Sequence, residues 1–275
     1  MAASDIESEV QIGPVGTLTN ASASPTPDAD ADDEAGGTMT LVEHLEELRK
    51  RLFIGLIAIV VATVVSFIFW HQILQFLLTP LPHISSRLTN NPNQKLVQHD
   101  ILEAFGIAIK LSLAAGIALA SPILLYQVWA YISPGLTKKE RRYAAPFTIL
   151  GSFLFIAGLA VGFIVLRYPV AWLINFGHKD FLLLLDANSY FTFVAYFMLA
   201  FGVVFELPMI LTALGAVGIV RSQTLRQKRK FILFGLWFLA TIITPGADPI
   251  SPLIIGVAMT LLFEFSIILL RILHK

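Results

Sequence analysis

The sequence predicts an all-α membrane protein, a polytopic bundle of six transmembrane helices. Of its 275 residues, 56% are hydrophobic and only 14% are charged, and the mean hydropathy is +0.75. The apolar residues form long uncharged runs of about 20 residues, the length that an α-helix needs to span a bilayer. A β-barrel would show short alternating strands, whereas these runs are continuous and rich in Leu, Ile, Phe and Ala.

Residues 1 to 38 form a separate segment, which we expect to be a disordered, acidic, cytoplasmic tail. The segment is rich in Ala, Ser, Thr, Pro, Gly and acidic residues and contains no apolar block. A secretory signal peptide would need a basic start and an apolar core, and both are absent here. The membrane domain is therefore expected over residues 39 to 275.

An amphipathic segment at residues 41 to 53, LVEHLEELRKRLF, leads into the first predicted helix. Leucines recur at helical spacing at positions 41, 45, 48 and 52, and acidic residues precede basic ones, which matches the helix macrodipole. Thr40 and Glu43 supply a capping-box start. This spacing suits a capped interfacial helix as well as a binding site, since its carboxylates could bind a cationic ligand.

Hydropathy predicts six spans, at about residues 52 to 71, 102 to 130, 146 to 167, 190 to 216, 231 to 244 and 250 to 271. Lys and Arg cluster before the first span, around residues 138 to 142 and 221 to 230, and at the C-terminus, which are alternate connections. By the positive-inside rule, both termini face the cytoplasm. The connections at 72 to 101, 168 to 189 and 245 to 249 then face outward.

Local signals fit these spans. Asp100 and Glu103 form a capping pair that starts the second helix, and Pro122 predicts a kink that bends its cytoplasmic end. Gly158 and Gly162 form a small-residue face, which predicts close helix packing. The fifth span has only about two-thirds of the usual spanning length, so either the bilayer thins there or flanking residues make up the difference.

Two carboxylates, Glu206 and Glu264, lie inside predicted spans. An ionised acid at mid-bilayer costs about 2.5 to 3.5 kcal/mol on insertion scales, so each should face the bundle, be neutral, or meet water and a partner. One interpretation is a proton path or a polar cavity. The other is a structural hydrogen bond to Ser, Thr or backbone freed by Pro208.

Glu140 is the only acid in the first internal loop, SPGLTKKERR. Its ordinary role would be a local ion pair, and exposed pairs are worth at most about 1 kcal/mol. A ligand that carries Arg offers another role. Carboxylates from separate segments, such as Glu47 and Glu140, could hold guanidinium groups in the bidentate geometry that Lys cannot reproduce.

Other chemistries lack their motifs. The sequence contains no GxxxxGK[ST] phosphate loop, no cysteine and no HExxH, and His44, His71, His83 and His99 show no paired metal spacing. We therefore predict no metal, no cofactor and no enzymatic activity, because no constellation of nucleophile, base and metal is visible.

Beyond residue 39, the chain resembles the TatC family, the multispanning receptor subunit of the twin-arginine (Sec-independent) protein translocase. The resemblance is carried by EHLEELRKRL at 43 to 52, SPILLYQVWAYISPGLTKKERR at 121 to 142, FGVVFELP at 201 to 208, and TPGADPIS with FEFSI near the end. It implies six helices in a concave, glove-like bundle, both termini in the cytoplasm, and a place in the bacterial cytoplasmic (inner) membrane.

The resemblance also implies a binding surface for the twin-arginine signal peptides of folded cargo. Glu140 is the residue expected to contact the arginine pair. The rest of the expected surface is Glu47, Arg49, Tyr131, His44, Leu48 and Pro134. Tyr131 stands where the family usually has Phe, which keeps an aromatic face and adds a hydroxyl. A second expected set docks partner helices or helps to thin the membrane: Glu206, Glu264, Gln127 and Asp248.

The leading interpretation is a receptor and scaffold that recruits single-span proteins of the TatA and TatB type, self-associates, binds no nucleic acid, and supports transport driven by the proton gradient. The alternative is a proton-coupled secondary transporter of small molecules, with Glu206 and Glu264 as proton carriers. Such transporters ordinarily show two related halves with interrupted helices at matching positions, and no convincing internal repeat is present. A membrane enzyme ranks last.

Overall fold

The computed structural model describes residues 41–81, 96–132, 144–176, 185–216, 220, 222–244 and 248–273, all within the unit Met39–Lys275. This part of the chain is nearly all helical, as predicted. Its helices are α1 (Leu41–Ile68), α2 (Trp70–Leu78), α3 (Glu103–Ile132), α5 (Ala144–Val165), α6 (Arg167–Phe176), α7 (Ala187–Phe205), α8 (Leu207–Ala216), α9 (Ser222–Gln227), α10 (Arg229–Ile243) and α11 (Ile250–Leu273). The tail expected at residues 1 to 38 lies outside the described residues.

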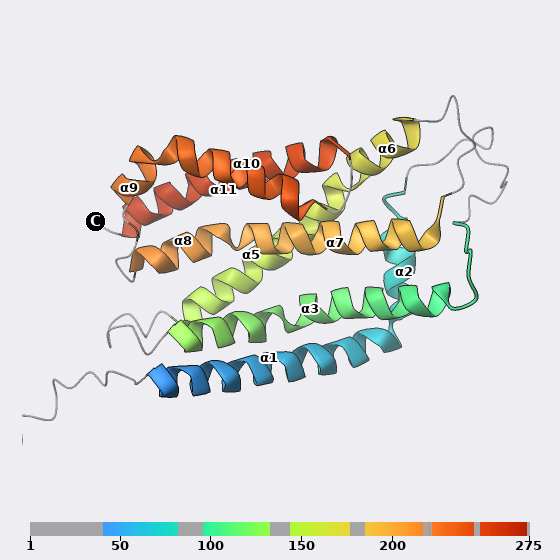
Figure 1. The fold of residues 1–275 in the computed structure, drawn as a ribbon, viewed down its shortest axis with the longest axis horizontal. Helices are drawn as coiled ribbons and strands as arrows, with labels where there is room; N and C mark the ends of the chain where they lie inside the picture. Colours follow the sequence, from blue (N-terminus) through green and yellow to red (C-terminus); the bar gives the residue numbers. More distant parts are fainter. Residues whose placement is uncertain are drawn as a thin grey trace, which may run out of the picture. The chain divides into compact units, whose positions relative to one another are not determined.

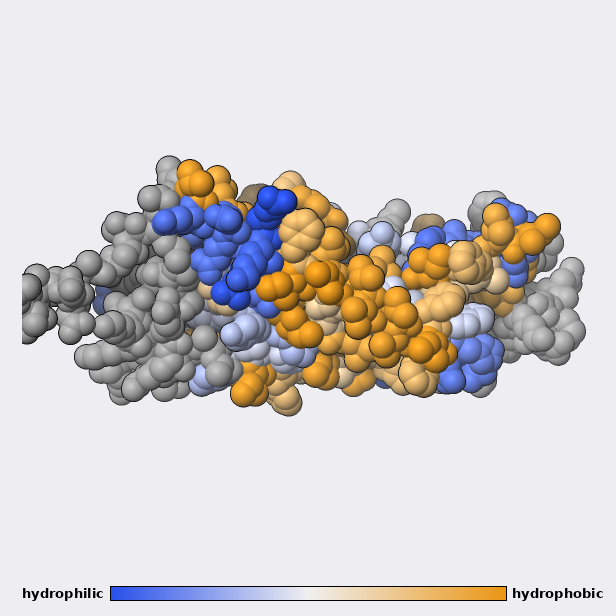
Figure 2. Space-filling view, turned by 90° about the horizontal axis from the view of Figure 1, so that it is seen from below, coloured by the Kyte–Doolittle hydropathy of each residue, from blue (hydrophilic) through white to orange (hydrophobic). Residues whose placement is uncertain are grey.

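Five helical segments of the described chain are long and apolar enough to cross a membrane: Val42–Ile68, Glu103–Ile132, Pro146–Phe176, Ala187–Gly215 and Ile250–Arg271. The remaining predicted span corresponds to α10, whose 15 residues fall short of the usual length, as its sequence indicated. Figure 2 shows hydrophobic residues in a band between hydrophilic patches near the two ends of the face that α1 covers. The chain is a multi-pass membrane protein, and the count of six spans stays a prediction.

The long helices pack side by side. Helix α1 lies along α3, which also contacts α5 and α7, while α11 packs against α7, α8 and α10 (Figure 1). The largest buried cluster is centred on α7, where Val194, Phe197 and Phe201 are at most 1% exposed. The start of α1 and the end of α11 lie at the same end of this bundle, and α2 and α6 lie toward the opposite end.

Small residues set the closest helix contacts. A Cβ atom on Gly158 of α5 would lie 2.6 Å from the carbonyl oxygen of Phe201, and one on Gly162 would lie 2.9 Å from the Cβ of Phe201. Only glycine permits this approach, so the predicted small-residue packing face is confirmed. Gly116 of α3 likewise faces the backbone of Thr63 on α1.

Prolines act differently at different places. Helix α3 continues through Pro122. Pro122 has no N–H to donate to the carbonyl of Ala118, and this carbonyl instead accepts a hydrogen bond from Ser121 Oγ at 2.8 Å. The bend predicted there stays a prediction. Two predicted spans are instead divided, at Leu166 between α5 and α6 and at Glu206 between α7 and α8. The outward connection expected from residue 168 is wrong in its start, because helix α6 extends the third span to Phe176.

Helices α3 and α7 are tied together where they begin. Val97 N donates to the carbonyl of Leu185 at 2.8 Å, and Ala187 N donates to the carbonyl of Val97 at 3.0 Å. These bonds form an isolated parallel bridge between Val97 and Asp186. The Glu103 carboxylate accepts a hydrogen bond from Asp100 N at 3.3 Å, so the predicted capping role of Glu103 is confirmed.

Candidate functional site

Several residues of the expected binding surface meet where α1 begins and α3 ends. The ring of His44 on α1 stacks on the ring of Tyr131 on α3, with centroids 4.5 Å apart and planes at 23°. His44 shares one face of α1 with Glu47 and Arg51, because residues three, four and seven apart lie on the same side of a helix. This polar face, and not the leucine stripe, packs toward α3. Leu45, for example, is 63% exposed.

A chain of polar contacts links Glu47 to α3. Arg51 Nη2 lies 3.3 Å from Glu47 Oε1, and Arg51 Nη1 donates to Gln127 Oε1 at 3.2 Å. The second carboxylate oxygen, Glu47 Oε2, is buried and has no hydrogen-bond partner among the described residues. Since a buried acceptor without a partner is costly, a hydrogen-bond donor that reached Glu47 Oε2 would stabilise this carboxylate.

Other members of the expected surface are more peripheral. Arg49 lines the same hollow as Glu47 and Arg51, and its guanidinium carbon lies 5.7 Å from the centre of the Phe53 ring. Leu48 is 39% exposed. Glu140 and Pro134 lie outside the described residues, so the pairing of Glu47 with Glu140 stays a prediction.

The structure gives different partners to the four residues that were expected to dock partner helices. Gln127 belongs to the contact chain of Glu47 and Arg51. Asp248 is buried and accepts hydrogen bonds from Ser251 N at 2.7 Å and from Ser251 Oγ at 2.9 Å. Because Ser251 lies in the first turn of α11, Asp248 acts as the N-terminal cap of that helix.

The two acids in predicted spans are also separate. Glu264 on α11 pairs with Arg229 at the start of α10, with Oε1 and Nη2 2.7 Å apart. Glu206 is 5% exposed, and neither of its carboxylate oxygens has a hydrogen-bond partner in the described part of the chain. Its Oε2 lies beside Gly151 of α5, 3.1 Å from where a Cβ on that glycine would be. Glu206 therefore faces the bundle, one of the outcomes expected from its sequence position.

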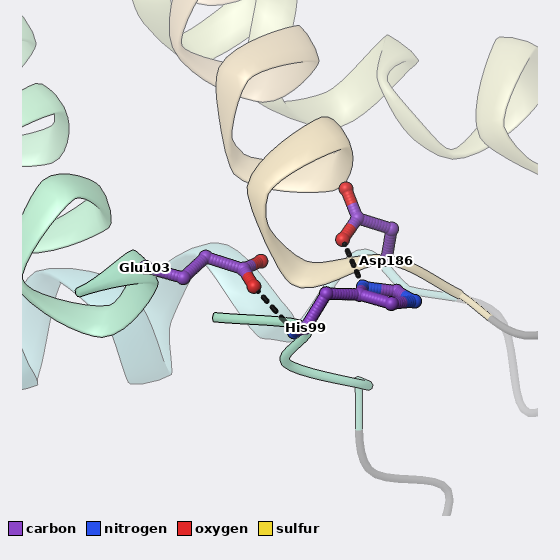
Figure 3. A group of neighbouring side chains, drawn as sticks. All are labelled: His99, Glu103 and Asp186. Carbon is purple, nitrogen blue, oxygen red and sulfur yellow. Dashed lines mark hydrogen bonds and ion pairs between the residues drawn. The ribbon is translucent and has the colours of Figure 1, made fainter. Parts of the chain in front are cut away.

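A further polar cluster joins the N-terminal ends of α3 and α7 (Figure 3). His99 Nδ1 lies 3.0 Å from Asp186 Oδ1, and His99 N donates to Glu103 Oε2 at 2.6 Å. In the described part of the chain, the ligand atoms of these three side chains lie close enough together to hold a metal ion. Their carboxylates already serve as helix caps, because Asn188 N donates to Glu103 Oε1 and Ser189 N donates to Asp186 Oδ2.

This capping also accounts for the ionisation of Asp186. Hydrogen bonds from Ser189, and then from His99, hold the pKa of Asp186 below its usual range. Sequence reasoning placed no function at His99 or Asp186. The sequence does contain a signal for the capping role of Asp186. In the run Asp186-Ala-Asn-Ser189, an acidic residue lies three residues before a backbone N–H of the first helical turn.

A helical bundle with several spanning segments, and with a charged cluster at one end of the first of them, defines a multi-pass membrane protein. The family model for Sec-independent protein translocase protein (TatC) matches residues 43–257. The chain belongs to the TatC family. This membership confirms the resemblance and the all-α fold, and the family is one of translocase components and not of enzymes.

Individual relatives agree with this assignment. TatC of Deinococcus radiodurans is 35% identical over 233 residues, which are 84% of this chain and 86% of that protein. TatC of Frankia casuarinae is 35% identical over 238 residues, which are 84% of this chain and only 65% of the relative. A crystal structure of a twin-arginine translocase receptor TatC matches with a TM-score of 0.70 and 30% identity, and covers 85% of this chain and 100% of that one.

Proposed function

We propose that this chain is the receptor and scaffold subunit of a twin-arginine translocase, and that it binds the signal peptides of folded cargo where α1 begins and α3 ends. The observation that carries this proposal is the buried Glu47 Oε2, which lacks a described partner and lies near the stacked pair His44 and Tyr131. Family membership supports the same assignment. The receptor interpretation therefore replaces the secondary transporter.

Guanidinium chemistry explains why arginine would be required. Arg51 is an internal guanidinium that contacts Glu47 Oε1 and Gln127 Oε1, so this surface carries acceptors of the kind that a guanidinium uses. An arginine of the signal peptide would donate to Glu47 Oε2 and, in this proposal, to Glu140. Lysine presents a compact ammonium and cannot donate to two acceptors in the same planar fork. Arg49, Leu48 and Pro134 would border the bound peptide.

We place the chain in the bacterial cytoplasmic membrane, with both termini in the cytoplasm and transport driven by the proton gradient. Lys and Arg on alternate connections support this orientation. The start of α1 and the end of α11 lie at one end of the bundle, which requires an even number of passes. Helix α10 would be the sixth pass, although its 15 residues rise only about 22 Å against a hydrocarbon core of about 30 Å.

The membrane partners would be single-span proteins of the TatA and TatB type, together with further copies of this chain. Gln127, Glu206, Glu264 and Asp248 are the residues proposed for docking. Because Glu206 is buried, we expect it to act by setting the packing of α8 against α5. Crosslinks from Ile210, which is exposed on α8, to a single-span partner should weaken in Glu206→Ala, and unchanged crosslinks would contradict this role.

The decisive experiment is photocrosslinking from positions 47 and 140 to a signal peptide that carries either RR or KK. Crosslinks to the RR peptide alone support the receptor assignment. Glu47→Gln should reduce RR binding, whereas Glu46→Gln, an exposed acid one residue away, should not. Equal crosslinking of RR and KK would reject the guanidinium site.

Glu140→Ala tests the acid that the family resemblance singles out. We expect this variant to lose RR binding while its thermal unfolding in detergent stays unchanged. Full RR binding by the purified variant would remove Glu140 from the site.

A further inference from the structure

A lysine inside the second span has no part in the proposed function. Lys110 lies seven residues after Glu103, where α3 begins, and so about 10 Å into the helix. Its Nζ donates to Asn188 Oδ1 at 2.6 Å and to Thr192 Oγ1 at 3.3 Å, both on α7. Because Asn188 lies in the first turn of α7, these bonds draw the ammonium toward the end where α3 and α7 begin. Charged side chains within spans are costly and usually functional.

An apolar groove continues from Lys110 toward the middle of the bundle. Its walls include Leu113, Ala114 and Ile117 of α3 and Ala195, Tyr196 and Leu199 of α7. These positions recur three and four residues apart, so each helix contributes one face. The two alanines leave space between the helices. The groove lies within two segments that are long and apolar enough to span a membrane, and it is open at the surface, where a lipid chain could enter it.

A second recess lies on the other side of Lys110, beyond the beginning of α3. His99, Asp100, Glu103, Gly106, Asp186 and Asn188 line it, and the His99 ring pairs with Asp186. A Cβ atom on Gly106 would meet nothing within 4 Å, so the wall of the recess is open there. Asn188 joins the two hollows, since it lines the recess and accepts a hydrogen bond from Lys110.

The groups along this surface follow a fixed order. Carboxylates come first, the Lys110 ammonium second and the apolar groove last. The carboxylate of Glu103 accepts from three backbone N–H groups, and a carboxylate has about four lone-pair sites. Lys110 uses two of its three N–H donors in its bonds to α7. About one acceptor site at Glu103 and one donor at Lys110 are therefore left for a ligand.

We propose that this α3–α7 surface binds one molecule of phosphatidylethanolamine. Its phosphate accepts a hydrogen bond from Lys110, its ammonium donates to the carboxylates of Asp100 and Glu103, and one acyl chain lies in the groove. Phosphatidylglycerol would satisfy Lys110, but its net negative charge would lie beside the carboxylates of Asp100 and Glu103 with no ammonium to offset it. Phosphatidylcholine carries no N–H with which to reach those carboxylates. The charges therefore select a zwitterionic lipid that bears a primary amine.

Native mass spectrometry of the full-length, delipidated protein in detergent tests this proposal. Phosphatidylethanolamine, phosphatidylglycerol and phosphatidylcholine with identical acyl chains are titrated into the wild type, Lys110→Gln, Asp100→Asn and Lys50→Gln. We expect the wild type to prefer phosphatidylethanolamine. Lys110→Gln keeps a donor for Asn188 and should weaken binding about five-fold, which corresponds to about 1 kcal/mol.

The other variants separate the parts of the site. Asp100→Asn should narrow the preference for phosphatidylethanolamine over phosphatidylglycerol, while Lys50→Gln, an exposed lysine on α1, should change nothing. Ala114→Trp should fill the groove and weaken binding of all three lipids without altering a charge. Tighter binding of phosphatidylglycerol by the wild type, or unchanged binding of phosphatidylethanolamine in both Lys110→Gln and Ala114→Trp, would overturn the proposal.

Discussion

At the scale of single residues, polar side chains act mainly where helices begin and end. Glu47 and Tyr131 were expected at the binding surface. The structure connects them through His44, which shares a face of α1 with Glu47 and stacks on the ring of Tyr131. The contact of Arg51 with Gln127 was not predicted, because the two residues are 76 positions apart. That pairing depends on the register between α1 and α3, and the close approach of Gly116 to Thr63 helps to set this register. No local pattern reveals such a register.

The Asp186 cap should make stability depend on pH. Its folded pKa lies below the usual pKa of an Asp side chain, about 3.9, so the charged cap stabilises the fold above that pH, and this stabilisation is lost as the pH falls through the folded pKa. Asp186→Asn keeps a capping side chain but no longer titrates. The unfolding midpoint in detergent should be higher for the wild type than for Asp186→Asn at pH 7, and the difference should be smaller at about pH 3. A difference of the same size at both pH values would contradict the linkage.

At the scale of helices, hydropathy predicted the positions of the spans well. The apolar length that a bilayer requires is a property of each segment by itself and does not depend on its neighbours. The breaks within spans were not predicted. The breaks at Leu166 and Glu206 fall shortly before Pro169 and Pro208, yet α3 passes through Pro122, where Ser121 supplies the missing hydrogen bond to Ala118. Proline alone therefore does not locate a break.

The contact of α5 with α7 should be intolerant of added volume. Gly158→Ala would place a methyl group against the backbone of Phe201, and overpacking of this kind costs about 1 to 3 kcal/mol. Gly235→Ala in α10 is the matched control, because a Cβ there meets nothing within 4 Å. Thermal unfolding in detergent should show a lower midpoint for Gly158→Ala only. Equal midpoints for the two variants would show that this helix contact can relax.

At the scale of the membrane domain, the distribution of basic residues predicts an orientation, whereas the length of α10 leaves the last crossing to be tested. The chain contains no cysteine, so each introduced cysteine is the only one present. The exposed positions Ile101, Lys228 and Pro249 lie on three different connections. Together they report on both ends of the bundle and on both sides of α10.

Labelling with a membrane-impermeant maleimide should distinguish these positions. In spheroplasts, Ile101→Cys and Pro249→Cys should react, whereas Lys228→Cys should react only after permeabilisation, because the positive-inside rule predicts that its connection faces the cytoplasm. Translocation activity of each variant is the control for native folding. Protection of Pro249→Cys together with Lys228→Cys would mean that α10 does not cross the membrane.

The described chain starts and finishes at the same end of the bundle, since the beginning of α1 and the close of α11 lie together there. Two copies can therefore be encoded as one polypeptide through a flexible Gly and Ser linker, without an added membrane-crossing segment. Such a tandem fusion would carry one altered and one unaltered Glu47 in a fixed ratio. It would thereby show whether neighbouring subunits recognise cargo independently or share a single recognition event.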